Sequence, residues 1–166
     1  MVTTRVLGID PGSRVTGFGV IESDGSHSRY LESGCIRTAS GDFPDRLGEI
    51  FRGLVEVLDA WQPQEVAVEQ VFVSRNVASA LKLGQARGAA ISAIVTRELP
   101  VYEYTPAAVK QGLVGNGRAE KEQVQHMVQV ILGLQGRMTL DQSDALAIAL
   151  CHAHSASTRT RIGGRL

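Results

Sequence analysis

Four acidic residues lie within or next to apolar segments of the sequence, where a carboxylate is unusual. Asp10 ends the apolar stretch "VLGI" and is followed at once by Pro11-Gly12. Glu69 stands in the apolar segment "AVEQVF", with no Lys or Arg within five positions on either side. Asp141 and Asp144 are three residues apart in "LDQSDALAIAL", so they would share one face of a helix. A buried Glu is rare unless it has a partner.

A cluster of acids without basic neighbours in the sequence predicts a cation that the protein binds. Oxygen ligands without His or Cys favour Mg²⁺ or Mn²⁺ over zinc. Several carboxylates that hold two ions about 3.5–4 Å apart can hydrolyse a phosphodiester bond. We therefore expect a site for two Mg²⁺ ions, with Mn²⁺ as a substitute, built from Asp10, Glu69, Asp141 and Asp144.

Simpler explanations exist for three of these acids. An Asp before Pro-Gly favours a turn, which would account for Asp10. Asp141 could be the N-cap of a helix, with Asp144 in its first turn interacting with the helix dipole.

A zinc site at Cys151 and His154 is a weaker alternative, because the other histidines are scattered in the sequence.

The elements that must position the acids follow from hydrophobic periodicity and from turn residues. Strands are expected at 4–10, 16–22, 28–37, 65–70 and 101–104, and helices from Pro44 to Trp61, at 76–98, 106–113 and 121–133, and from about Asp141. The order β-β-β-α-β-α-β-α-α predicts an α/β fold, a mixed five-stranded sheet with helices on both faces. If the fourth strand runs parallel beside the first, Asp10 and Glu69 become neighbours at the carboxyl ends of their strands.

Length and composition predict one domain at 1–156, followed by a basic tail at 157–166 that we expect to be disordered. No apolar stretch approaches the ~20 residues that a membrane span needs, and two cysteines form no disulfide framework. These features favour the cytoplasm. Residues 1–69 carry 6 Lys and Arg against 11 Asp and Glu, and residues 70–166 carry 11 against 6. This asymmetry permits a phosphate-binding face beside an acidic pocket.

Six motifs give the chain a close resemblance to a known family. They are "GIDPGSRVTGFGVI", "GCIRT", "EQVF", "ALKLGQARG", "AEKEQVQHMV" and "DQSDALAIAL". Over about residues 6–154 the chain resembles the bacterial RuvC Holliday-junction resolvase family. The resemblance implies an RNase H-like fold and a homodimer that nicks two strands of a four-way DNA junction symmetrically, in recombination and repair. It also suggests contact with the branch-migration proteins RuvA and RuvB.

The resemblance further implies roles for individual residues. The four acids match the catalytic carboxylates of the family, and Lys110 and Lys121 match basic residues beside them. Phe72 matches an aromatic residue that stacks on a base near the crossover, a contact type that contributes ~1–3 kcal/mol. Further DNA backbone contacts are expected from Arg75, Asn76, Lys82, Arg87 and Arg118. The small-residue helix at 76–98 is expected to form the dimer contact.

Three other functions are weighed against this one. "GIDPG" also resembles the phosphate-binding hairpin of actin-like ATPases, but no second Gly-rich phosphate motif is present. A non-catalytic module that binds DNA junctions, or an RNA-processing nuclease, could use the same fold. The presence of all four acids favours an active nuclease.

Overall fold

The computed structural model describes residues 2–39, 41–71 and 76–163, with side chains as far as residue 158. Within these residues the elements follow each other as three strands, a helix, a strand, a helix, a strand and three helices. Their bounds are β1 Thr4–Asp10, β2 Val15–Ser23, β3 Ser28–Arg37, α1 Phe43–Trp61, β4 Glu65–Glu69, α2 Val77–Val95, β5 Val101–Tyr104, α3 Pro106–Val114, α4 Lys121–Leu132 and α5 Leu140–Gly163.

The sheet is mixed, as the sequence predicts. Its strand order is β3-β2-β1-β4-β5, in which β1, β2 and β3 pair antiparallel while β4 and β5 run parallel to β1. Ile9 of β1 lies opposite Val68 of β4. Asp10 and Glu69 therefore follow at adjoining strand ends, which confirms the expected neighbourhood of the two acids.

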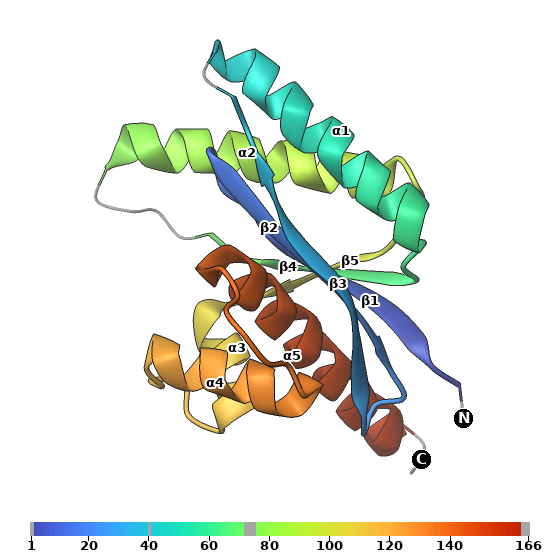
Figure 1. Ribbon diagram of the computed structural model, residues 1–166. Helices are drawn as coiled ribbons and strands as arrows, with labels where there is room; N and C mark the ends of the chain where they lie inside the picture. Colours follow the sequence, from blue (N-terminus) through green and yellow to red (C-terminus); the bar gives the residue numbers. More distant parts are fainter. Residues whose placement is uncertain (1, 40, 72–75, 164–166) are drawn as a thin grey trace.

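Helices cover both faces of the sheet: α1 and α2 lie on one side, and α3, α4 and α5 on the other (Figure 1). Side chains alternate along β1, so the two faces have separate cores. Leu7 and Ile9 pack with the core under α1 and α2, whereas Val6 packs with the core under α5. From Ala145 to Leu150 every residue of α5 is buried. This helix is therefore the centre of its layer.

Two details differ from the sequence-based expectation. Three helices follow β5, in agreement with the three ranges expected after residue 104, although the expected order β-β-β-α-β-α-β-α-α counted only two of them. The backbone of residues 157–163 belongs to α5, where a disordered tail was expected. None of the described helices is both long and apolar enough to cross a membrane.

Candidate active site

Asp10 is held at the end of β1 by the turn that follows it. Thr16 is fully buried, and its hydroxyl donates to the Gly12 carbonyl (3.1 Å) and accepts from the Gly12 amide (3.3 Å). These two bonds close the turn between β1 and β2, so that Asp10 lies opposite Gly17 in the antiparallel ladder. Asp10 therefore ends a strand just before a turn that two hydrogen bonds hold closed.

The end of β4 is held from two sides. The Gln70 amide donates to the Tyr104 carbonyl of β5 (2.7 Å), and Arg87 Nε donates to the Glu69 carbonyl (3.4 Å). The Arg87 guanidinium also forms an ion pair with Glu103. In the structure Arg87 contacts the protein beside Glu69, and its expected contact with the DNA backbone stays a prediction.

The first turn of α5 is closed by a capping box at Thr139 and Gln142. Thr139 Oγ1 accepts from the Gln142 amide (3.2 Å), and Gln142 Oε1 accepts from the Thr139 amide (3.1 Å). Such reciprocal bonds satisfy the free amides at a helix start. Thr139 is thus the N-cap, and the alternative role of Asp141 as the cap is wrong. Asp141 and Asp144 remain available for other contacts.

Two strand glycines let α5 lie directly on the sheet. A Cβ at Gly17 would come within 2.1 Å of the Asp141 carbonyl oxygen, and a Cβ at Gly8 within 2.1 Å of the Ala145 carbonyl oxygen. A glycine inside a strand often marks such a close approach of another backbone. Because Gly17 pairs with Asp10, its missing side chain brings the start of α5 over Asp10. Sequence reasoning missed this role, although "VLGID" and "TGFG" carried the signal.

The other three acids lie near enough for their charges to act on Asp10. Burial, followed by the charges of Asp144, Glu69 and Asp141, raises the pKa of Asp10 to about 7. Burial and then Asp144 raise the pKa of Glu69. Burial also raises the pKa of Asp144, although Lys121 opposes this. The ends of β1 and β4 and the start of α5 thus bring together partly buried carboxyl groups whose charged forms are poorly solvated. Such a group of carboxylates favours binding of a cation.

Both lysines predicted for the site join it. Lys121 Nζ lies 3.2 Å from Asp144 Oδ2. Burial lowers the pKa of Lys121, but the hydrogen bond and charge of Asp144 outweigh it, so the pKa is raised. A groove of about 270 Å³ is lined by Lys110 and Lys121 together with Glu69 and Asp144, and by the apolar residues Pro106, Val109, Val124 and Ala147. The groove combines acids and bases at the carboxyl end of the sheet.

The donor set fits a hard divalent cation. All four candidate ligands offer carboxylate oxygens, as Mg²⁺ and Mn²⁺ prefer. Burial, together with the neighbouring acids, already disfavours the charged forms of Asp10 and Glu69. Among the described residues, no three His, Cys, Asp or Glu side chains stand in a coordinating arrangement. Asp144 instead contacts Lys121. To bind a cation, the acid side chains therefore have to turn toward it, and Asp144 has to leave Lys121 for the metal ion.

The other expected DNA contacts have varied surroundings. The Asn76 side chain accepts from the Ser79 amide as the N-cap of α2. Lys82 Nζ lies 5.9 Å from the centroid of the Phe43 ring. Arg118 is exposed in the turn before α4. Phe72 and Arg75 lie outside the residues that the structure describes, so their roles stay predictions.

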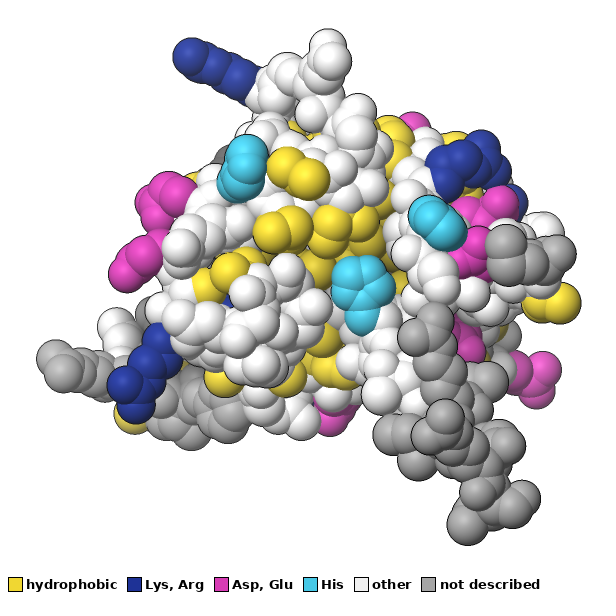
Figure 2. Space-filling view, turned by 90° about the horizontal axis from the view of Figure 1, so that it is seen from below, with side chains coloured by type: hydrophobic (Ala, Val, Ile, Leu, Met, Phe, Trp, Pro, Cys, Tyr) yellow, Lys and Arg dark blue, Asp and Glu magenta, His cyan; other side chains and the backbone are white. Residues whose placement is uncertain are grey.

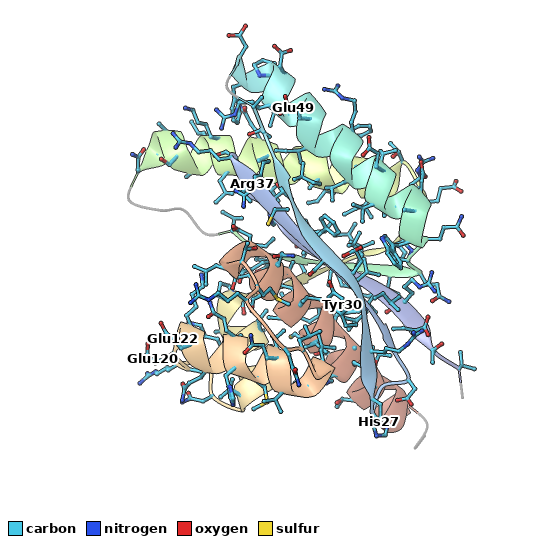
Figure 3. All side chains as sticks on the ribbon, viewed as in Figure 1. His27, Tyr30, Arg37, Glu49, Glu120 and Glu122 are labelled. Carbon is cyan, nitrogen blue, oxygen red and sulfur yellow. The ribbon has the colours of Figure 1, made fainter. Side chains whose placement is uncertain are left out.

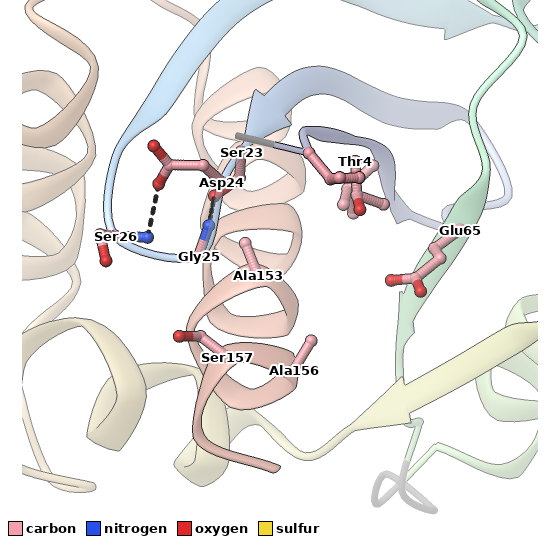
Figure 4. Close-up of a pocket in the computed structure, with 11 residues that line it drawn as sticks. Thr4, Ser23, Asp24, Gly25, Ser26, Glu65, Ala153, Ala156 and Ser157 are labelled. Atoms are coloured by element: carbon pink, nitrogen blue, oxygen red, sulfur yellow. Dashed lines mark hydrogen bonds between the residues drawn. The ribbon is translucent and has the colours of Figure 1, made fainter. Parts of the chain in front are cut away.

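Other surfaces lack the character of this site. A pocket of about 480 Å³ lies at the opposite end of the sheet, between the β2–β3 turn and α5 (Figure 4). Its Asp24 accepts from the Ser26 and His27 amides, and its Glu65 accepts a hydrogen bond in the contact with buried His152. The face in Figure 2 has apolar side chains at its centre and scattered Lys and Arg at its rim. Neither region gathers carboxylates as the end of β1 does.

Comparison with known proteins agrees with this geometry. The family model for crossover junction endodeoxyribonuclease RuvC matches residues 6–152. The chain belongs to the RuvC family. RuvC of Alkalilimnicola ehrlichii is 57% identical over 158 residues, 95% of this chain and 96% of that protein. RuvC of Shewanella amazonensis is 54% identical over 160 residues, 96% of this chain and 92% of that protein. Both relatives are named as crossover junction endodeoxyribonucleases.

Solved structures of RuvC confirm the RNase H-like fold. Thermus thermophilus RuvC in complex with a Holliday junction substrate is 41% identical, with a TM-score of 0.89 over 95% of this chain and 97% of that one. The yeast mitochondrial Holliday junction resolvase Ydc2 is 15% identical with a TM-score of 0.68, a similarity of fold alone. The family resemblance inferred from the motifs is thereby confirmed. RuvC nucleases depend on a metal ion.

Proposed function

We propose that this chain is a crossover junction endodeoxyribonuclease that resolves four-way DNA junctions by paired symmetric nicks. The observation that carries the proposal is the convergence of Asp10, Glu69, Asp141 and Asp144 from β1, β4 and α5, in a member of the RuvC family. The similar RuvC of Thermus thermophilus forms a complex with a Holliday junction substrate. Junction DNA is the corresponding substrate of this chain, in recombination and repair.

The four acids would hold Mg²⁺, with two ions in the site and Mn²⁺ as a substitute. Bound divalent ions lower the pKa of water and stabilise charge on the attacking and leaving oxygens of a phosphodiester. The strand ends contribute Asp10 and Glu69 in fixed positions, and the capped turn of α5 contributes the other two. Such preorganisation places charge where the reaction needs it without rearrangement of the backbone.

Lys110 and Lys121 would act on the DNA from within the same groove. Their ammonium groups line the groove with Glu69 and Asp144, so a phosphate in it would meet two positive charges. Lys121 is held in place by Asp144 before DNA arrives. Both lysines would offset negative charge that builds up on the phosphate in the transition state.

A homodimer accounts for two coordinated nicks. The N-terminal half of α2 is largely exposed, including the apolar residues Val77 and Leu81, which are 64% and 63% exposed. A Cβ at Gly84 or Gly88 would meet no atom within 4 Å, so this face permits close approach of a second helix. Activity in the bacterial cytoplasm and contact with RuvA and RuvB are supported by family membership.

Cleavage of a synthetic four-way junction tests the proposal. We expect symmetric nicks with Mg²⁺, no cleavage with a chelator, and little cleavage of linear duplex or of an RNA–DNA hybrid. Glu69→Gln should abolish nicking while junction binding in a gel shift stays within about threefold, because it removes one ligand charge and keeps the side-chain shape. Glu56→Gln, an exposed position on α1, is the matched control and should cleave normally.

Three outcomes would contradict the proposal or part of it. Binding without cleavage by the unmodified protein in Mg²⁺ or Mn²⁺ would indicate a non-catalytic junction-binding module. Preferred cleavage of the RNA–DNA hybrid would indicate an RNA-processing nuclease. Equal loss of binding and cleavage in Glu69→Gln would remove Glu69 from the ligand set.

A further inference from the structure

We propose that Gln142 is a positioning residue for the active site. Its side-chain amide ties the first turn of α5, which carries Asp141 and Asp144, to the edge strand β3 through Ser33. The inference rests on the proposed nuclease function, in which Asp141 and Asp144 bind metal ions and must be held in place to do so.

One end of the Gln142 amide closes the helix. Gln142 Oε1 accepts from the Thr139 amide (3.1 Å) and from the Thr139 hydroxyl (3.0 Å). Thr139 Oγ1 in turn accepts from the Gln142 amide and lies 3.4 Å from Cys35 Sγ of β3. Because the O–H of Thr139 already donates a hydrogen bond to Gln142 Oε1, its oxygen can accept one from the Cys35 thiol. The cap itself therefore contacts the edge strand.

The other end of the same amide reaches β3. Gln142 Nε2 donates to Ser33 Oγ (3.2 Å), and Ser33 is almost fully buried. Ser33 Oγ lies 3.1 Å from the Tyr30 hydroxyl, which belongs to the same strand (Figure 3). β3 pairs with β2 only, as the outermost strand of the sheet. One side chain thus connects the helix cap with the buried Ser33 hydroxyl on the sheet edge, which in turn contacts the half-buried Tyr30.

The backbone contact in this turn cannot replace these bonds. The close approach of Asp141 to Gly17 limits how near α5 can come, but it does not pull the turn toward the sheet. Gln142 lies between the two acids in sequence and supplies directed bonds in two directions. Ligand side chains must be held within about 0.5 Å of their productive geometry, and neighbouring hydrogen bonds provide that precision. Loss of the amide would leave the helix in place but loosen the turn.

Three variants separate the two ends of the amide. Gln142→Ala removes both connections, Gln142→Glu keeps the acceptor for the cap but loses the donor to Ser33, and Ser33→Ala removes the partner on β3. The matched control is Gln129→Ala, which removes a glutamine amide of α4 that donates to the Gly136 carbonyl. Each protein is assayed by calorimetric Mn²⁺ titration without DNA, by single-turnover junction cleavage in saturating Mg²⁺, and by thermal unfolding.

We expect Gln142→Ala to weaken Mn²⁺ binding and slow single-turnover cleavage by about 10-fold each, the scale for lost partners of metal ligands. The junction Kd should change less than about twofold. Ser33→Ala and Gln142→Glu should show intermediate losses, and Ser33→Ala should add little to Gln142→Ala because both belong to one network. Gln129→Ala should match the unmodified protein in Mn²⁺ affinity and rate.

Several results would overturn the inference. Mn²⁺ affinity and rate within twofold of the unmodified protein in Gln142→Ala would do so. A lower Tm in Gln142→Ala combined with no effect of Ser33→Ala would reduce Gln142 to a helix cap. If the unmodified protein neither binds Mn²⁺ nor cuts junctions, the proposed function fails. Amide exchange at residues 141–144 then decides the inference, and equal protection in Gln142→Ala and Gln129→Ala would reject it.

Discussion

At the scale of the residue, the most informative group is the Asp10 carboxyl. Burial and three neighbouring acids raise its pKa to about 7. The folded protein therefore keeps a proton that the unfolded chain releases near its ordinary value of 3.8. The metal-free protein should lose stability as pH rises from about 4 to about 7, and the loss should level off above that range. Glu69 and Asp144 act in the same direction, because their pKa values are also raised.

Asp10→Asn should abolish cleavage and stabilise the metal-free protein. The amide cannot ionise, so its burial near three acids no longer has an electrostatic cost. At pH 8 in chelator we expect the free energy of unfolding to increase by about 1–3 kcal/mol, with little change at pH 4. Urea unfolding at a series of pH values measures both.

The control for Asp10→Asn is Asp59→Asn, at an exposed carboxylate that pairs with Arg97. It should not change the pH dependence of stability. The explanation of the Asp10 pKa would be wrong if Asp10→Asn kept the pH dependence of the unmodified protein.

At the scale of the element, the contact between α5 and the sheet determines where two of the acids lie. α5 packs on β1 and β2 with its backbone close to Gly8 and Gly17. The two pairs of acids are therefore positioned by different features. The register of β1 and β4 places Asp10 and Glu69, and the close approach of the α5 backbone to the sheet places Asp141 and Asp144. A change in either feature should damage the site without removing an acid.

Gly17→Ala tests the close approach. Its Cβ would come within 2.1 Å of the Asp141 carbonyl, so α5 has to move away from Asp10. We expect a loss of about 1–3 kcal/mol of stability, typical of overpacking, and a fall in the cleavage rate of at least about 10-fold. Chemical unfolding and single-turnover cleavage measure the two effects.

Gly41→Ala is the control, since a Cβ there meets no atom within 4 Å. It should leave both stability and rate nearly unchanged. Normal cleavage by Gly17→Ala would show that the acids of α5 tolerate displacement, which would weaken their assignment as ligands.

At the scale of the whole molecule, the layers around the sheet have different outer surfaces. α2 extends beyond the sheet at its N-terminal half (Figure 1) and exposes Val77 and Leu81 there. The face in Figure 2, by contrast, has apolar side chains at its centre. The proposed dimer through α2 would place two active sites in one particle. The paired nicks of the proposed function need two active sites.

Leu81→Glu should dissociate the proposed dimer. A charge at the centre of an apolar contact is strongly unfavourable unless it is paired. We expect the Kd of dimerisation to rise at least about 10-fold in light-scattering or sedimentation measurements, and junctions to accumulate single nicks. Val130→Glu on α4, where Val130 is 59% exposed, is the matched control and should stay dimeric. An unchanged dimer in Leu81→Glu would place the interface elsewhere.

The sequence by itself determined most of the architecture and singled out the four acids as candidate metal ligands. Alternating and helical apolar patterns are local, so nearly all elements could be predicted within a few residues. Handedness and parallel pairing then sufficed to make Asp10 and Glu69 neighbours. Lys110 and Lys121 were predicted from the family motifs alone, since nothing local distinguishes them from surface lysines.

The tertiary structure decided what depends on contacts between distant segments. It assigned the helix cap to Thr139, engaged Arg87 with Glu69 and Glu103, and explained Gly17 by the backbone of α5. These features share one physical reason. A hydrogen bond or a close approach between residues far apart in the chain depends on how whole elements pack. The spacing of residues within one element does not predict such a contact.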